Sequence, residues 1–198
     1  MTTIVVARKN GQIAIAADTM SSLGDTRQSA DLVLNHNKIL KVGTSYIGIT
    51  GHCAHHDVMQ HLFGNMKKIP EFDTPQSIFA FFRGLHQKLK DYYYINTEEE
   101  EDDEYESSQI MCMIANPHGI FGVYTFREVE SYSKYYAFGS GYQFALGALH
   151  VAYDALDSAE EIAKLGVETA AKFDKGTGLP LTCYTLKEKA RRRAGSGR

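Results

Sequence analysis

The chain begins Met1-Thr2-Thr3-Ile-Val-Val, so a threonine directly follows the initiator methionine. A small second residue permits removal of Met1, which would leave Thr2 with a free α-amino group beside its own hydroxyl. A hydroxyl is a poor nucleophile at neutral pH, but an α-amine with a reference pKa of about 7.7–8.0 can accept its proton. Thr2 could therefore act as both nucleophile and base, although Met-Thr-Thr is also a common start for chains with no such role.

The segments next to Thr2 predict strands that would hold it in place. Residues 3–9 are rich in β-branched side chains, Asn10-Gly11 is a strong hairpin signal, and residues 12–18 alternate small and apolar side chains. A polar loop follows, and residues 38–42 and 46–50 then predict a second pair of strands. The N-terminus is therefore expected to lie against a sheet.

Two helices are expected after these strands, the first over residues 55–66 and the second beginning after Thr74. Thr74 is a typical N-cap residue and Pro75 suits the first helical position, ahead of apolar residues at helical spacing. The acidic run from Glu98 to Glu106 then predicts a solvated loop over residues 97–107, because so many carboxylates cannot be buried together.

A second block repeats this order of strands followed by helices. Residues 109–115 and 120–125 predict a hairpin, and residues 131–138 are expected to pair beside it. Ser158 and Glu161 form the capping-box pattern that opens a helix. The remaining elements, in chain order, are helices over residues 142–156 and 158–173 and a strand over residues 181–186. Sheets packed together, with helices on both outer faces, are the economical layering for this order, so the expected fold class is α+β.

The opening Thr2-Thr-Ile-Val-Val, followed by Asn10-Gly11 and Ile-Ala-Ile-Ala-Ala-Asp18, resembles the start of proteasome β subunits and of the bacterial HslV peptidase. In that family the strand-ending aspartate stands at the same distance from the threonine as Asp18 does from Thr2. Lys38-Ile-Leu-Lys, which leads toward the glycine turn at Gly51, resembles the family's lysine strand. The resemblance covers nearly the whole chain and implies a four-layer αββα sandwich of the N-terminal nucleophile hydrolase type.

The resemblance implies a catalytic set around the N-terminal threonine. Thr2 would be the nucleophile after removal of Met1, and Lys38 would be the cation that favours its alkoxide. Asp18 would hold Lys38 through a charge-assisted hydrogen bond. The N–H of Gly51 would donate to the oxyanion of the tetrahedral intermediate.

Further positions match family residues near the terminal amine and the substrate. Ser140, within Gly-Ser-Gly, would lie beside the amine, and Asp174 with Thr177 would complete the hydrogen-bond network around it. Ser21 and Ile49 match positions that contact the substrate backbone or line the first specificity pocket. These residues would orient the amine, pass protons and bind the substrate.

Each assignment has a simpler structural alternative. Asp18 could end a strand at a turn, Lys38 could lie on the surface, and Ile49 could be a core strand residue. The polar residues near the later helix ends could serve only as helix-terminus residues. The chain also carries a short insertion between Asp18 and Lys38, and spacing equal to that of the family would place Leu34 at the lysine position.

The resemblance implies a threonine-type endopeptidase that works inside stacked homo-oligomeric rings, close to the group of β-proteobacterial proteasome homologues. Peptides or unfolded proteins would be its substrates, and an ATPase unfoldase could supply them. The chemistry needs no metal or organic cofactor. A non-catalytic ring subunit with a structural or assembly role is the alternative.

Length and composition bound the remaining classes. The 198 residues are 43% apolar and 23% charged, which is average for a globular protein, and we expect one domain over residues 1–198. The net charge of −3 does not indicate a protein that binds nucleic acid through general electrostatic attraction. No apolar segment has the length of a membrane span. Three widely spaced cysteines suit a reducing cytoplasm. The basic tail from about residue 188 to residue 198 is expected to be flexible.

A cluster of histidines lies near the start of the first expected helix. His52, Cys53, His55, His56 and His61 include residue types that bind zinc, and positions four apart share a helical face. The spacing matches no usual zinc signature, so a polar helix start is the favoured interpretation and no metal is expected.

Overall fold

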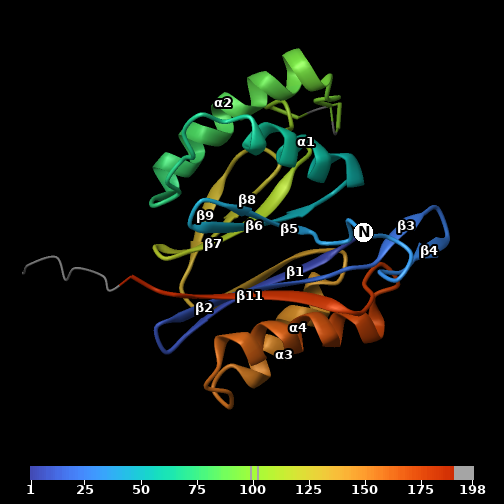
Figure 1. Ribbon diagram of the computed structural model, residues 1–198, viewed down its shortest axis with the longest axis vertical. Coiled ribbons are helices and arrows are strands. Elements are labelled where there is room, and N and C mark those ends of the chain that lie inside the picture. The colour runs from blue at the N-terminus through green and yellow to red at the C-terminus, as the bar shows by residue number, and fades with distance from the viewer. Residues whose placement is uncertain (99, 102, 190–198) are drawn as a thin grey trace, which may run out of the picture.

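Two antiparallel sheets pack face to face, and a pair of helices covers the outer face of each, which gives an αββα order of layers (Figure 1). The computed structural model describes residues 1–98, 100–101 and 103–189. Over this part of the chain the expected α+β class, with helices on both outer faces, is confirmed.

The first sheet contains the N-terminal strand near its centre. Its order is β10-β1-β2-β11, and all neighbouring strands are antiparallel. The strands span Thr3–Lys9 (β1), Gln12–Asp18 (β2), Tyr135–Gly139 (β10) and Leu181–Lys187 (β11). Asn10 (φ 51°) and Gly11 (φ 72°) supply the positive φ values that a tight turn between β1 and β2 requires. Strands on both sides of β1 therefore fix the position of its N-terminal end.

The second sheet is built from the middle of the chain. Its order is β5-β6-β7-β8-β9, again antiparallel throughout. The strands span Ile39–Val42 (β5), Ser45–Thr50 (β6), Met111–Asn116 (β7), Gly119–Val123 (β8) and Val129–Tyr132 (β9). A separate hairpin of β3 (Ser21–Leu23) and β4 (Thr26–Gln28) follows the first sheet in the chain.

The helices form the two outer layers. Helices α1 and α2 lie over the second sheet, and α3 and α4 lie over the first (Figure 1). Their bounds are Cys53–Gly64 (α1), Pro75–Tyr93 (α2), Tyr142–Ala152 (α3) and Ala159–Phe173 (α4).

Strands β1 and β2 are buried on both faces. Ile4 and Ile15 belong to the apolar layer between the two sheets, whereas Val5 and Ala14 face the layer beneath α3 and α4. Because side chains alternate along a strand, this double burial explains why both segments read as nearly continuous apolar runs. The strands are thus held from above and below as well as from the sides, which suits a rigid support for the N-terminus.

The strand expected over residues 131–138 was a wrong prediction. The segment forms two strands in different sheets, because β9 pairs with β8 in the second sheet and β10 pairs with β1 in the first. The chain crosses between the sheets at residues 133–134, where the Lys134 carbonyl accepts a hydrogen bond from the Arg8 N–H at 2.7 Å. Alternating side chains look the same in either sheet, so the sequence pattern did not reveal the crossing.

Several element bounds also differ from those expected. Helix α1 begins at Cys53, two residues early, because His52 acts as its N-cap and accepts from the Ala54 N–H. Helix α3 ends at Ala152, earlier than the expected residue 156. The polar loop after β2 contains the β3–β4 hairpin, whose short strands lack the apolar alternation that predicts a strand.

The acidic loop is tied at both ends. The Ser107 N–H donates to the Thr97 carbonyl at 2.9 Å, and the Gln109 side chain donates to the Glu98 carbonyl at 3.0 Å. Glu106 accepts from Lys90 on α2 at 2.6 Å. The described part of the loop is otherwise exposed, as expected.

The C-terminal segment continues along the first sheet beyond β11. The Glu188 N–H donates to the Gly11 carbonyl at 2.9 Å, and the Lys189 N–H donates to the Pro117 carbonyl at 2.7 Å. The first two residues of the expected flexible tail are therefore held by backbone hydrogen bonds, and residues 190–198 lie outside the described residues. None of the described helices is long and apolar enough to cross a bilayer.

Candidate active site

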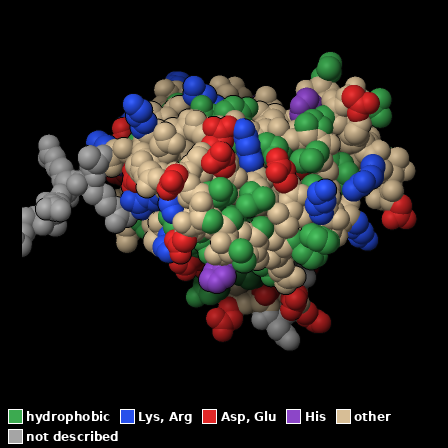
Figure 2. Space-filling model, turned by 90° about the horizontal axis from the view of Figure 1, so that it is seen from below, with side chains coloured by type: hydrophobic (Ala, Val, Ile, Leu, Met, Phe, Trp, Pro, Cys, Tyr) green, Lys and Arg blue, Asp and Glu red, His purple; other side chains and the backbone are tan. Residues whose placement is uncertain are grey.

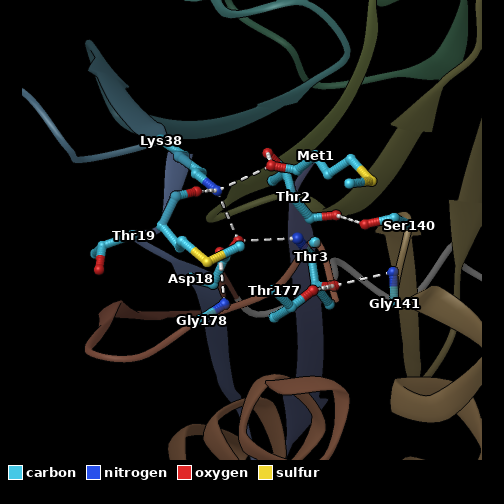
Figure 3. Close-up of polar contacts among 12 residues, drawn as sticks. Met1, Thr2, Thr3, Asp18, Thr19, Lys38, Ser140, Gly141, Thr177 and Gly178 are labelled. Atoms are coloured by element: carbon cyan, nitrogen blue, oxygen red, sulfur yellow. Dashed lines mark hydrogen bonds and ion pairs between the residues drawn. The ribbon is translucent and has the colours of Figure 1, made fainter. Parts of the chain in front are cut away.

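The two N-terminal threonines lie in different surroundings. Thr3 begins β1 and is fully buried, and its Oγ1 lies 2.6 Å from Thr177 Oγ1 and accepts from the Gly141 N–H at 3.1 Å. Thr2 lines a surface cavity, and its Oγ1 donates to the Met1 carbonyl at 2.6 Å. Thr3 is therefore committed to the protein interior, whereas Thr2, which is 6% exposed, lines the cavity next to Met1 (Figure 3).

Asp18 ends β2 directly beneath the N-terminus. Its Oδ1 accepts from the Thr3 N–H at 2.9 Å, and its Oδ2 accepts from the Gly178 N–H at 3.1 Å. The side chain is inaccessible to solvent, and burial raises the pKa of Asp18 above its ordinary value even though Lys38 and these hydrogen bonds act in the opposite direction. Asp18 thus links β1, β2 and the loop after α4.

Lys38, the residue before β5, reaches across to Asp18 and the N-terminus. Its Nζ donates to Asp18 Oδ1 at 2.9 Å, to the Met20 carbonyl at 2.5 Å and to the Met1 carbonyl at 3.2 Å (Figure 3). Burial lowers the pKa of Lys38, and the neighbouring Asp18 carboxylate raises it in part. Thr2 Oγ1 and Lys38 Nζ therefore share one acceptor, the Met1 oxygen, so the hydroxyl and the ammonium meet at the same point.

The spacing of the family would have placed Leu34 where Lys38 stands. The Leu34 side chain is fully exposed, whereas Lys38 contacts Asp18. The extra residues between Asp18 and Lys38 therefore do not prevent Lys38 from contacting Asp18.

A second polar cluster lies on the other side of Thr2. The Ser140 N–H donates to the Thr2 carbonyl at 2.8 Å, and Ser140 Oγ donates to Asp174 Oδ2 at 2.6 Å. Thr177 Oγ1 donates to the same Asp174 oxygen at 2.6 Å. Burial acts to raise the pKa of Asp174, but the hydrogen bonds from Ser140 and Thr177, with help from the positive N-terminal amine, lower it overall. Asp174 is therefore held as a carboxylate close to the N-terminus.

Glycine is required beside Ser140 for steric reasons. Gly139 has φ 98°, and a Cβ at this position would overlap the Thr2 carbonyl oxygen. A Cβ at Gly141 would overlap Thr3 Oγ1. The Gly-Ser-Gly motif thus lets the chain pass close enough for Ser140 to bond to the backbone of Thr2.

Gly51 forms the turn between β6 and α1 at the rim of the cavity. Its φ of 108° is rarely adopted by other residues, and a Cβ there would lie 2.9 Å from His55 Nδ1. The cavity has a volume of about 210 Å³. Five of the predicted site residues line it, namely Thr2, Ser21, Lys38, Ile49 and Gly51.

The other predicted residues lie behind Thr2 and away from the cavity wall. Asp18 contacts Lys38, and Ser140, Asp174 and Thr177 form the cluster on the opposite side. The nine predicted residues are thus gathered around one threonine. Among the described residues, no group of three or more His, Cys, Asp or Glu side chains is arranged to hold a metal ion.

Comparison with solved structures gives close matches over almost the whole chain. A structure of the bacterial proteasome homologue BPH of Thiobacillus denitrificans is 43% identical, with a TM-score of 0.90, and the match covers 95% of this chain and 99% of that one. A structure of BPH in complex with epoxomicin is 41% identical, with a TM-score of 0.89, over 94% of this chain and 99% of that one. The chain belongs to the proteasome β-subunit and HslV-like family.

A more distant member shares the fold of this proteasome-type subunit. The eukaryotic HslV of Trypanosoma brucei is 17% identical and has a TM-score of 0.66, and the match covers 94% of this chain and 99% of that one. No protein-family model and no curated protein sequence matches the chain. The family expected from the N-terminal motifs is therefore confirmed by solved structures.

Some groups in the site of this proteasome-type subunit were missed by sequence reasoning. The Met20 carbonyl binds Lys38, and the Gly178 N–H binds Asp18, but backbone groups carry no signal in residue type. Thr3 was missed as the residue that joins Thr177 to Gly141. Its place directly after Thr2 was a usable signal, because neighbouring residues at a strand end point to opposite faces.

Two histidines of α1 in this proteasome-type subunit are expected to make the free energy of unfolding depend on pH. His55 Nδ1 and His56 Nε2 are buried and have no hydrogen-bond partner among the described residues. Burial lowers the pKa of both imidazoles below 6.5. The unfolded chain therefore binds more protons than the folded one below about pH 6.5. The contribution of these two neutral histidines to the free energy of unfolding is fully present above that pH and is lost as the pH falls.

We expect the melting temperature to fall by about 2–5 °C between pH 7.5 and pH 5.5 through these two residues. The variant with both His55→Gln and His56→Gln should lose this part of the pH dependence, whereas His150→Gln, an exposed control, should keep it. Scanning fluorimetry at a series of pH values measures the effect. An unchanged slope in the double variant would contradict the assignment.

Proposed function

We propose that this proteasome-type subunit is a threonine-type endopeptidase whose nucleophile is Thr2, exposed by removal of Met1. One observation carries the proposal most directly. The Met1 carbonyl oxygen accepts from both Thr2 Oγ1 and Lys38 Nζ, at 2.6 and 3.2 Å, at the edge of an open cavity. The Thr2 hydroxyl, the partly buried ammonium of Lys38 and the chain terminus thus converge on one point.

The first chemical step would form a tetrahedral intermediate on Thr2. The hydroxyl oxygen attacks the carbonyl carbon of a substrate peptide bond, and the free α-amine of Thr2 takes the hydroxyl proton. The charge of Lys38 stabilises the developing alkoxide. The N–H of Gly51 donates to the oxyanion of the tetrahedral intermediate.

The next steps would form the acyl ester and then hydrolyse it, which restores the enzyme. The protonated amine of Thr2 gives its proton to the nitrogen of the leaving peptide, the C–N bond breaks, and an acyl ester remains on Thr2. Water then attacks the ester, with the same amine as base, and releases the carboxylic acid product. No metal or organic cofactor takes part.

Ser140, Asp174 and Thr177 would position the amine. Ser140 already bonds to the Thr2 carbonyl through its N–H, and its hydroxyl bonds to Asp174, whose charge interacts with the amine of Met1. A carboxylate beside the amine stabilises its protonated form and can hold it in one orientation. Ser21 and Ile49, which line the cavity, would contact the substrate.

Assembly into stacked homo-oligomeric rings would enclose these sites. The outer face of α3 and α4 exposes apolar side chains among charged ones (Figure 2). Phe144 and Phe173 lie 5.5 Å apart between ring centroids, and both are more than 40% exposed, at 42% and 68%. Such a surface suits contact with another copy of the chain. Peptides or unfolded proteins would then be the substrates, and an ATPase unfoldase could deliver them.

A non-catalytic ring subunit is the second candidate. Retention of Met1 in the mature protein would favour it. While Met1 is attached, the Thr2 nitrogen is part of an amide and cannot act as a base. Met1 is 48% exposed, so a processing enzyme could reach it. The two candidates therefore differ in whether Thr2 becomes the first residue.

Intact-mass analysis with and without epoxomicin tests the proposal. Epoxomicin is chosen because it is bound in a structure of the Thiobacillus denitrificans relative. We expect the protein to lack Met1 and to gain one inhibitor mass, which peptide mapping locates on Thr2. A retained Met1, or a processed Thr2 that never reacts, would favour the non-catalytic ring subunit.

A further inference from the structure

The side chains that face Thr2 across the cavity come from the first turns of α1. Cys53, His56 and Asp57 line the cavity and stand three and four positions apart, so they share one face of the helix. Thr2 and Ile49 line the same cavity from the sheet side. A substrate residue whose carbonyl lies at Thr2 would therefore extend its side chain between Ile49 and α1.

We propose that Asp57 makes this cavity selective for peptides with a lysine or arginine at the residue whose carbonyl is attacked. The inference rests on the proposed function of Thr2 and names the substrate class of that site. Asp57 is exposed and lines the cavity, and it forms no ion pair with any described residue. A reachable, unpaired carboxylate can accept a charge-assisted hydrogen bond from an ammonium or guanidinium group.

Lys38 offers no competing site for an acidic side chain. Its ammonium contacts Asp18 Oδ1, the Met20 carbonyl and the Met1 carbonyl, which supply an acceptor for each of its three protons. Asp18 balances its charge at a distance of 2.9 Å. Removal of Met1 would turn the freed donor toward Thr2, so the lysine remains occupied by the catalytic groups.

The histidine next to Asp57, His56, does not cancel its charge. Burial lowers the pKa of His56 more than Asp57 raises it, so the imidazole is neutral near pH 7. His52 Nδ1 accepts from the Ala54 N–H at 3.2 Å. The same bond satisfies one of the free N–H groups at the start of α1, which reduces the attraction of this helix end for an anion. The imidazole of His56 therefore does not offset the carboxylate of Asp57.

Short fluorogenic peptides that differ only at the cleaved residue test this inference. Arginine, leucine and glutamate substrates are compared on the wild type, on Asp57→Asn and on Asp154→Asn, which removes an exposed carboxylate at the end of α3. For the wild type we expect kcat/KM with arginine to exceed that with leucine about tenfold, with glutamate the poorest. Asp57→Asn should lower the arginine value about tenfold and leave leucine within about twofold, and Asp154→Asn should change neither.

A second measurement avoids any effect of substitution on assembly. Peptide aldehydes with arginine or leucine at the same position are tested as inhibitors of the wild type, and the arginine compound should bind about tenfold more tightly. Equal affinity, or an arginine preference that survives in Asp57→Asn, would overturn the role of Asp57. If the role of Asp57 is overturned but Thr2 still reacts with epoxomicin, the proposed function of Thr2 stands. Absence of both the adduct and all turnover would overturn the two together.

Discussion

Replacing Thr2 with alanine is expected to lower kcat/KM for peptide hydrolysis by at least about 10³-fold. The variant loses the hydroxyl that would form the acyl ester. Thr3, the adjacent threonine, is fully buried and bonded to Thr177 and Gly141, so its hydroxyl cannot reach a substrate. Initial rates on fluorogenic peptides, with the processed N-terminus verified by mass, provide the measurement.

Matched variants separate loss of chemistry from loss of structure. Thr2→Ser keeps a hydroxyl and an amine and should retain measurable activity, whereas Thr2→Ala should not. Thr3→Val removes a buried hydroxyl, and valine has about the same volume as threonine. We expect this variant to lower the free energy of unfolding by about 1–3 kcal/mol while Thr2 remains reactive with epoxomicin. Full activity in processed Thr2→Ala would refute Thr2 as the nucleophile.

Replacing Lys38 with methionine is expected to lower kcat by about 10²–10³-fold, with a smaller change in KM. The ammonium would act on the transition state, because its charge stabilises the alkoxide that develops on Thr2. Methionine keeps most of the volume of the side chain, so the substitution removes the charge with little loss of packing. Steady-state kinetics on the assembled protein separate kcat from KM.

The same substitution leaves Asp18 without its cation. Asp18 is inaccessible to solvent, and removal of one partner of a buried ion pair typically costs about 3–5 kcal/mol of stability. We therefore expect a lower melting temperature for Lys38→Met, and the double variant Lys38→Met with Asp18→Asn should recover part of the stability but none of the activity. Lys41→Met, a change at an exposed lysine of β5, is the control. Wild-type kcat in Lys38→Met would rule out the lysine assignment.

Motifs along nearly the whole chain predicted the family, and the order of strands and helices predicted the layers of the fold. Residues 3–18 encode a hairpin through β-branched side chains and Asn10-Gly11, and the alternation of Ile and Ala encodes a strand buried on both faces. These are local patterns, so the sequence carries them in full. The segment 131–138 was misread for the opposite reason, since the choice between two sheets depends on partners far away in the chain.

The sequence alone determined which residues are candidates, and it determined the order in which they occur. Only the tertiary structure decided that Lys38, and not the residue at equal spacing, contacts Asp18, because a loop can absorb extra residues without moving the strands on either side. It also decided that Thr2 and Thr3 have different environments, and that Asp57 faces the same cavity as Thr2. Such contacts join segments that are distant in the chain, so residue type and spacing cannot specify them.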